Sequence, residues 1–170
     1  VLEYDDIMNK QRGAVYGMRR GLLEGVEQRE RVFAMAKGLV ETLVIDRAPE
    51  KARVDEWDLA GLDSDILTRF GVSIDSSRYN ELSREEMEDS IFDLLKIRYE
   101  QKEALIGPEY IRDAERIIML NVIDNQWKDH LLSMDHLKEG IGMRAYGQKD
   151  PLLEYKKESF TLFQDMMDRI

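Results

Sequence analysis

The chain has 170 residues, of which 43% are hydrophobic and 35% are charged, a composition typical of a helix-rich protein large enough to bury an ordinary core. Its formal net charge of −10 argues against nucleic acid as the main partner, because phosphate binding needs a basic surface. The absence of cysteine excludes disulfides and thiolate zinc sites, and two histidines alone argue against a histidine-based metal site. No apolar run approaches the roughly 20 residues that span a bilayer.

Residues 4–46 contain no proline, and we predict one long helix over this range. Its apolar residues follow a spacing of three and four, with one gap of seven: Val15, Met18, Leu22, Val26, Phe33, Ala36, Val40 and Leu43. At about 1.5 Å per residue, such a helix would be a rod about 65 Å long. That length exceeds the diameter of a small domain, so we expect the helix to join several bodies.

Glycines recur every four residues in the first half of this segment: Gly13, Gly17, Gly21 and Gly25. Each should cost roughly 1 kcal/mol relative to alanine inside a helix. One interpretation is local sequence drift in a helix that is held by its packing. The other is a smooth groove that lets another backbone approach closely. A membrane helix pair is excluded, because Arg19, Arg20 and Glu24 interrupt the pattern.

The sequence changes character after Pro49. A shorter helix is predicted to end at Gly71, and its apolar residues are Trp57, Leu59, Leu62, Ile66, Leu67 and Phe70. Residues 72–81 are rich in serine, aspartate and asparagine and are predicted to form a loop.

The next helix has a clear start signal. Ser83 as N-cap and Glu86 three residues later are predicted to form a capping box, and Leu82 with Met87 supplies a hydrophobic staple. The helix is predicted to end at Gly107, which precedes a proline.

Residues 108–170 are predicted to form a hairpin of two helices. The first helix carries a heptad pattern: Leu120, Ile123, Trp127, His130, Met134, Leu137 and Ile141. The second helix repeats the spacing: Leu152, Tyr155, Ser159, Leu162 and Met166. Between them, residues 140–151 contain three glycines and a proline and are predicted to be a compact turn. Asp150 suits the N-cap of the second helix, and Pro151 suits its first position.

The turn should present four side chains at the end of the hairpin: Arg144, Tyr146, Gln148 and Lys149. Tyr146 falls outside the apolar pattern and has no obvious core to fill. It either folds back against the hairpin or contacts another molecule. An aromatic ring flanked by cations at the end of a rigid hairpin favours the contact.

No catalytic or metal-binding constellation emerges from the sequence. His130 and His136 point about 240° apart around a helix, so they cannot share a site. We expect His130 to be a buried histidine with a hydrogen-bond partner and Trp127 to pack in the core. Phosphate-binding glycine loops and serine nucleophile motifs are absent, so we expect no catalytic residue, no cofactor site and no metal site. Strand-like alternation is also absent, and the predicted fold class is all-α.

Four stretches of the chain resemble the C-terminal helical part of the SecA family: residues 2–12 (LEYDDIMNKQR), 119–137 (MLNVIDNQWKDHLLSMDHL), 140–151 (GIGMRAYGQKDP) and 154–156 (EYK). The resemblance covers essentially the whole chain and is looser over residues 48–106. It implies that residues 1–47 are the long helix of a helical scaffold domain. Residues 48–107 would be a small helical wing domain, and residues 108–170 a two-helix finger that completes the scaffold.

The family is a bacterial ATP-driven motor of protein export, so the resemblance implies a function and partners. The finger would approach the cytoplasmic mouth of the SecY channel, and Tyr146 at its tip would contact the unfolded preprotein, with Arg144, Gln148 and Lys149 as neighbouring contacts. ATP and magnesium would bind to nucleotide-binding domains outside this chain, so the chain alone would not be an enzyme. The parent protein would be cytoplasmic and peripheral on the inner membrane.

Other interpretations stay open from the residues alone. The chain begins at Val1 and stops within an apolar pattern, so we expect a piece of a longer protein. A self-contained helical adaptor without a motor is the main alternative, and an independent helical enzyme would need a ligand set that we do not find. The long apolar patterns also allow a homodimer. The glycine spacing at 13–25 departs from the family pattern.

Overall fold

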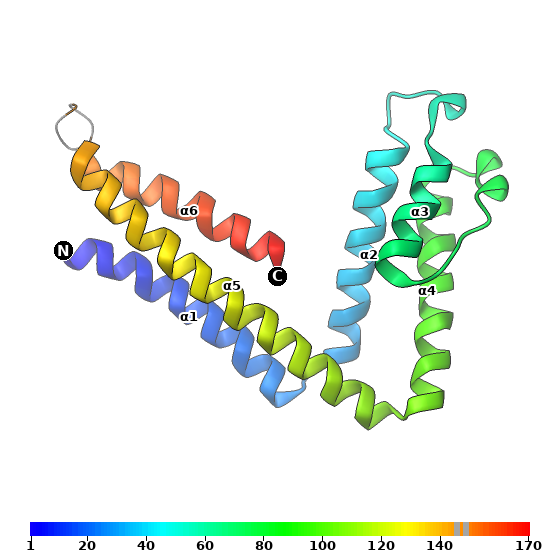
Figure 1. The fold of residues 1–170 in the computed structure, drawn as a ribbon, viewed down its shortest axis with the longest axis horizontal. Helices are drawn as coiled ribbons and strands as arrows, with labels where there is room; N and C mark the ends of the chain where they lie inside the picture. Colours follow the sequence, from blue (N-terminus) through cyan, green and yellow to red (C-terminus); the bar gives the residue numbers. More distant parts are fainter. Residues whose placement is uncertain (145–146, 148–149) are drawn as a thin grey trace. The chain divides into compact units, whose positions relative to one another are not determined.

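The computed structural model describes residues 1–144, 147 and 150–170, and every regular element in these residues is helical, which confirms the predicted all-α class (Figure 1). Two of the elements are short 3-10 helices, η1 and η2. The elements in chain order are α1 (Leu2–Glu24), α2 (Gln28–Arg47), η1 (Val54–Glu56), α3 (Leu59–Phe70), η2 (Ser76–Glu81), α4 (Arg84–Ile106), α5 (Pro108–Arg144) and α6 (Pro151–Arg169).

These elements form two compact units that interleave along the sequence. The terminal unit comprises Val1–Val26 and Asp113–Ile170, and the middle unit comprises Glu27–Arg112. Helix α2 therefore groups with the segment that was predicted to be the wing, and most of α5 groups with α1 and α6. The scaffold, wing and finger ranges remain predictions.

The prediction of one helix over residues 4–46 is wrong, because α1 ends at Glu24 and a separate helix, α2, begins at Gln28. Gly25 adopts the left-handed conformation, with φ of 67°, and its N–H donates to the carbonyl of Leu22 at 3.1 Å. Glu27 is also left-handed, with φ of 51°, and α2 starts at the next residue. A glycine adopts this conformation at no steric cost, which makes it the usual residue at a helix C-terminus.

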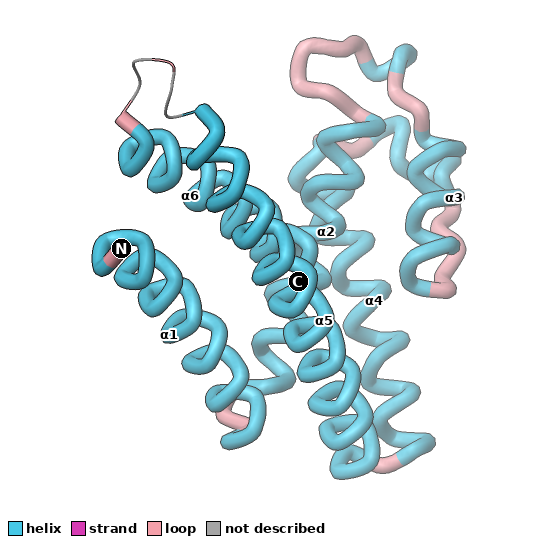
Figure 2. Tube along the Cα trace, turned by 60° about the vertical axis from the view of Figure 1, so that its left-hand side comes forward, coloured by secondary structure: helices cyan, strands magenta, loops and turns pink. Residues whose placement is uncertain are grey.

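The terminal unit packs α1, α5 and α6 side by side (Figures 1 and 2). Helix α5 confirms the heptad pattern, since six of the seven predicted positions are buried: Ile123, Trp127, His130, Met134, Leu137 and Ile141. Leu120 is half-buried and packs against the same core. In α6, Tyr155, Ser159 and Met166 are buried as predicted. The apolar stripes of the hairpin therefore close on each other and on α1.

The middle unit packs α2 against both α3 and α4 around its own apolar core. Helix α3 ends at Phe70, and Gly71 caps it with φ of 67°, as predicted. Trp57 lies before α3 rather than in it. Within the predicted loop 72–81, residues Ser76–Glu81 form η2, whose Tyr79 is buried in the core. The serine and aspartate content of that segment concealed the anchoring tyrosine.

The capping signals of the middle unit are confirmed. The Glu86 N–H donates to Ser83 Oγ at 3.2 Å, and the Ser83 N–H donates to Glu86 Oε2 at 2.8 Å. The backbone hydrogen bond lowers the pKa of the Glu86 carboxyl. Helix α4 ends at Ile106, and Gly107, with φ of 105°, separates it from Pro108 at the start of α5.

Candidate functional site: the end of the α5–α6 hairpin

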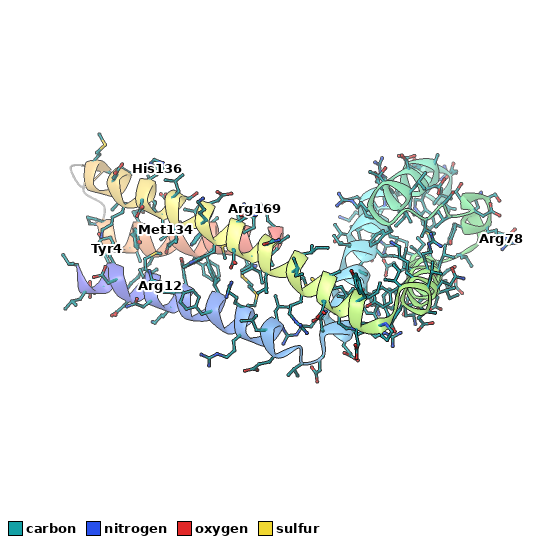
Figure 3. All side chains as sticks on the ribbon, turned by 60° about the horizontal axis from the view of Figure 1, so that its bottom comes forward. Tyr4, Arg12, Arg78, Met134, His136 and Arg169 are labelled. Carbon is teal, nitrogen blue, oxygen red and sulfur yellow. The ribbon has the colours of Figure 1, made fainter. Side chains whose placement is uncertain are left out.

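The far end of the hairpin is held by an apolar cluster that also includes α1. Met134, Leu137 and Ile141 of α5 pack with Tyr155 of α6, and all four are buried. Tyr4 of α1 lies against Tyr155, with ring centroids 4.6 Å apart, and Figure 3 labels Tyr4 and Met134 on their separate helices. Burying such side chains contributes roughly 1.5–3 kcal/mol each to the free energy of unfolding. Helices α5 and α6 are therefore firmly packed up to the last turns before the hairpin end.

Below this cluster, a buried polar chain links the three helices. His130 of α5 is 1% exposed, and its Nε2 lies 2.7 Å from Gln11 Oε1 of α1. The Gln11 side-chain amide donates to the carbonyl of Ser159 in α6 at 3.3 Å. Since Gln11 Oε1 can only accept, the neutral imidazole carries its proton on Nε2. The predicted hydrogen-bond partner of His130 therefore exists, and it is Gln11.

The surroundings keep His130 neutral. Burial lowers the pKa of the imidazole from its ordinary value of 6.5, and the positive charge of Arg169 adds to the shift. Trp127 stacks on the ring at a centroid distance of 5.5 Å, and Phe163 meets it edge-on at 5.6 Å. His136 is exposed on the outside of α5, so the two histidines do not share a site (Figure 3).

The predicted turn begins later than the glycines suggested. Helix α5 continues through Gly140 and Gly142 and ends at Arg144. Ile141 between the glycines is only 2% exposed. Its burial, worth about 1.5–3 kcal/mol, offsets the roughly 1 kcal/mol that each glycine costs inside a helix. The helix therefore does not stop where glycine content alone would end it.

Arg144 is the one predicted contact residue that lies within the described part of the chain. Its guanidinium pairs with the carboxylate of Glu158 on α6, and Met143 beside it is 78% exposed. The Gly147 N–H donates to the Arg144 carbonyl at 3.0 Å. Tyr146, Gln148 and Lys149 lie outside the described residues, so their predicted contact roles remain predictions.

The second helix of the hairpin starts as predicted. The Asp150 carboxylate accepts a hydrogen bond from the Leu152 N–H at 3.0 Å, and Pro151 occupies the first turn. The cap satisfies a backbone donor that the helix itself leaves free. The start of α6 is therefore fixed by local sequence.

Three residues that hold the hairpin on α1 could not be predicted from the sequence: Arg19, Asp124 and Gln11. Arg19 of α1 forms a bidentate ion pair with Asp124 of α5. Its Nε donates to Oδ1 at 2.8 Å, and its Nη2 donates to Oδ2 at 3.1 Å. This hydrogen-bonded pair lowers the pKa of Asp124. Gln11 of α1 contacts His130 of α5 and Ser159 of α6, as described above. Each contact joins residues more than 100 positions apart, and a single sequence carries no signal for such pairs.

Among the described residues, no group of three histidine, cysteine, aspartate or glutamate side chains could hold a metal ion. Within the same residues, no helix combines the length and the apolar character that crossing a membrane requires. In the described residues, the hairpin end offers an exposed methionine beside the Arg144–Glu158 ion pair, on two firmly packed helices, and this surface is accessible to another molecule.

Comparison with known proteins identifies the family. The family model described as the SecA wing and scaffold domain matches residues 1–170. The chain is 59% identical over its full length to the protein translocase subunit SecA of Solibacter usitatus (strain Ellin6076) and covers 18% of that protein. It is 54% identical to the subunit of the same name from Koribacter versatilis (strain Ellin345), with 98% of the chain and 17% of that protein covered. The chain thus spans less than a fifth of these relatives' length. It belongs to the SecA wing and scaffold family, as its sequence motifs predicted.

Proposed function

We propose that this chain is the scaffold, wing and finger part of a SecA-type protein translocase. The observation that carries the proposal is the match of the family model to every residue from 1 to 170, together with relatives named as translocase subunits. Residues 1–47, 48–107 and 108–170 supply the long scaffold segment, the wing and the two-helix finger. The α1–α2 break at Gly25 makes the scaffold segment two helices rather than one.

In this function, the chain couples ATP-driven movement to the transport of preproteins through the SecY channel. ATP and magnesium bind to nucleotide-binding domains of the parent protein, outside this chain, and the chain alone does not hydrolyse ATP. The parent protein works in the cytoplasm and on the cytoplasmic face of the inner membrane. Its partners are the SecY complex, the unfolded preprotein and its own nucleotide-binding domains, and a homodimer is one further arrangement.

The packed hairpin supports a lever-like role for the finger. Three sets of contacts fasten α5 and α6 to α1: the apolar cluster around Tyr155, the chain from His130 through Gln11 to Ser159, and the pair of Arg19 with Asp124. Packed interfaces move as rigid bodies rather than deforming continuously. A displacement imposed on α1 would therefore be passed to the end of the hairpin.

The tip carries the contact with the polypeptide. An unfolded chain offers backbone amides and varied side chains, so a useful contact must be tolerant of sequence. Tyr146 offers an apolar ring and one hydroxyl at low cost in conformational entropy. Arg144, Gln148 and Lys149 add polar and charged contacts around it.

The substitution Tyr146→Ala in the full-length translocase tests this role. Loss of one aromatic contact of about 0.5–1.5 kcal/mol should lower preprotein transport into inner-membrane vesicles by about twofold to twelvefold. The matched control is Tyr110→Ala, which removes a 75% exposed tyrosine near the start of α5. Circular dichroism should show both variants folded. Undiminished transport by the Tyr146 variant would reject the contact role of Tyr146.

A further inference from the structure

The middle unit contains a second surface feature that the proposed function does not use. A groove of about 180 Å³ runs between α2 and α4 beside the end of α3. Four aromatic side chains line it, Phe33 from α2, Phe70 from α3, and Phe92 and Tyr99 from α4, together with four aliphatic ones. Three of the five phenylalanines in the chain therefore line one groove.

These rings are ordered among themselves but are not enclosed. Phe33 meets Tyr99 edge-on at a centroid distance of 5.0 Å and Phe92 at 6.3 Å. All three side chains are half-buried, and none belongs to the fully buried core of the unit. Apolar rings gathered in one open groove are a common sign of a binding site, because leaving them in water forgoes their burial energy.

The rim of the groove is basic, although the unit around it is acidic. Residues 27–112 carry 20 acidic and 13 basic side chains, a net charge of −7. Yet the charged residues that line the groove are Lys96, Arg98 and Lys102, all from α4. A basic rim on an acidic unit is a local feature that the overall charge does not explain.

The acidic side chains of α4 near the groove are already engaged. Asp93 lies 2.9 Å from Lys96, and Glu100 lies 3.0 Å from Arg29. Glu103 pairs with Arg112. In contrast, no ion pair to Arg98 or Lys102 is found in the part of the chain that the structure describes. The groove therefore presents uncompensated positive charge along one edge.

The size of the groove limits what it can hold. Small-molecule and cofactor pockets are typically about 300–1,000 Å³, well above this volume. A groove of 180 Å³ is better suited to one or two large apolar side chains of a peptide. Its basic edge would then favour acidic residues beside those side chains, by charge complementarity.

We propose that this groove binds peptide segments in which one or two large apolar side chains are flanked by aspartate or glutamate. The aromatic walls bury the apolar side chains, and Arg98 and Lys102 attract the acidic flanks. All lining residues lie within the middle unit, and the proposal does not depend on the transport role of the finger.

Fluorescence anisotropy with three labelled 12-residue peptides tests the proposal on the whole chain. The first peptide carries one phenylalanine and one leucine flanked by glutamates. The second replaces the glutamates with lysines, and the third replaces the apolar residues with serines. Only the first should bind, and its affinity should fall as salt is raised from about 0.05 to 0.5 M, because salt screens exposed charges.

Three variants locate the binding site. Lys102→Glu should weaken binding of the acidic peptide by about fivefold, whereas Lys51→Glu, at an exposed lysine outside the groove, should leave it unchanged. Ala36→Trp fills the groove from α2 and should weaken binding more than about tenfold. Circular dichroism and urea unfolding identify variants that fold, and the comparison uses only those.

Four results would overturn the proposal. The first is equal binding of the acidic and basic peptides, and the second is an unchanged affinity of Ala36→Trp for the acidic peptide. The third is an equal loss of that affinity in Lys102→Glu and Lys51→Glu. The fourth is a dimer in sedimentation that Ala36→Trp dissociates, since the groove would then be covered by a second copy.

Discussion

At the scale of single residues, the buried contact between His130 and Gln11 best illustrates how the hairpin is specified. The heptad pattern predicted that His130 is buried, and its partner had to exist because an unpaired buried polar group costs about 1–3 kcal/mol. Which residue serves as partner could not be predicted, since Gln11 lies 119 positions away and reads as an ordinary polar residue of α1. Gln11 is buried because α5 and α6 pack against α1.

The lowered pKa of His130 predicts a specific dependence of stability on pH. As the pH falls below about 6.5, the unfolded chain takes up a proton that the folded chain resists. His130 should therefore lower the free energy of unfolding progressively below pH 6.5, by up to about 1.4 kcal/mol per pH unit, and have no such effect above it. Urea unfolding of the native chain and of His130→Gln between pH 5 and 7.5 measures the contribution of His130 to the pH dependence of the free energy of unfolding. Parallel pH profiles for the two proteins would contradict it.

At the scale of elements, glycines show how packing decides where helices end. Gly25, Gly71 and Gly107 all have positive φ and separate helices, whereas Gly140 and Gly142 lie inside α5. The residue type is the same, so composition alone could not distinguish these cases. Capping boxes and the proline at the start of α6 were predictable because their hydrogen bonds are local. The extension of α5 through its glycines depends on distant contacts, because Ile141 is buried against Tyr155 of α6.

Two glycines of the same spacing should respond in opposite ways to alanine. Gly17→Ala lies inside α1, where an added Cβ meets no atom within 4 Å, so it should raise the free energy of unfolding by about 0.5–1 kcal/mol. Gly25→Ala forces a left-handed alanine, whose Cβ would also lie 3.1 Å from Arg116 Nη2, and should lower it by about 1–2 kcal/mol.

Urea unfolding of both variants checks this pair, and it also bears on the two interpretations of the glycine spacing. Stabilisation by Gly17→Ala, with normal transport in the full-length protein, supports sequence drift. Stabilisation with impaired transport supports a surface that another backbone approaches. Destabilisation by Gly17→Ala would refute the structural argument for an open helix face.

At the scale of the whole molecule, sequence motifs predicted the family and the all-α class, but not the division into units. The terminal unit brings residues 1–26 together with residues 113–170, and the middle unit consists of the residues that lie between these two segments in the sequence. Periodicity identifies which face of each helix is buried, yet it does not name the partner helix. That choice comes from the fit between faces, as in the pairing of α1 with α6. The aromatic groove was missed for the same reason.

The most direct test of the central claim is a site-specific cross-link from the finger tip to a preprotein in transit. The photoreactive amino acid benzoylphenylalanine replaces Tyr146 in the full-length translocase, and a second protein carries it at the exposed Tyr110 instead. A preprotein is stalled in the channel by a folded domain and the sample is irradiated. If Tyr146 contacts the polypeptide, an ATP-dependent cross-link to the preprotein forms from position 146 and none forms from position 110. Equal cross-linking from both positions, or none from position 146, would contradict it.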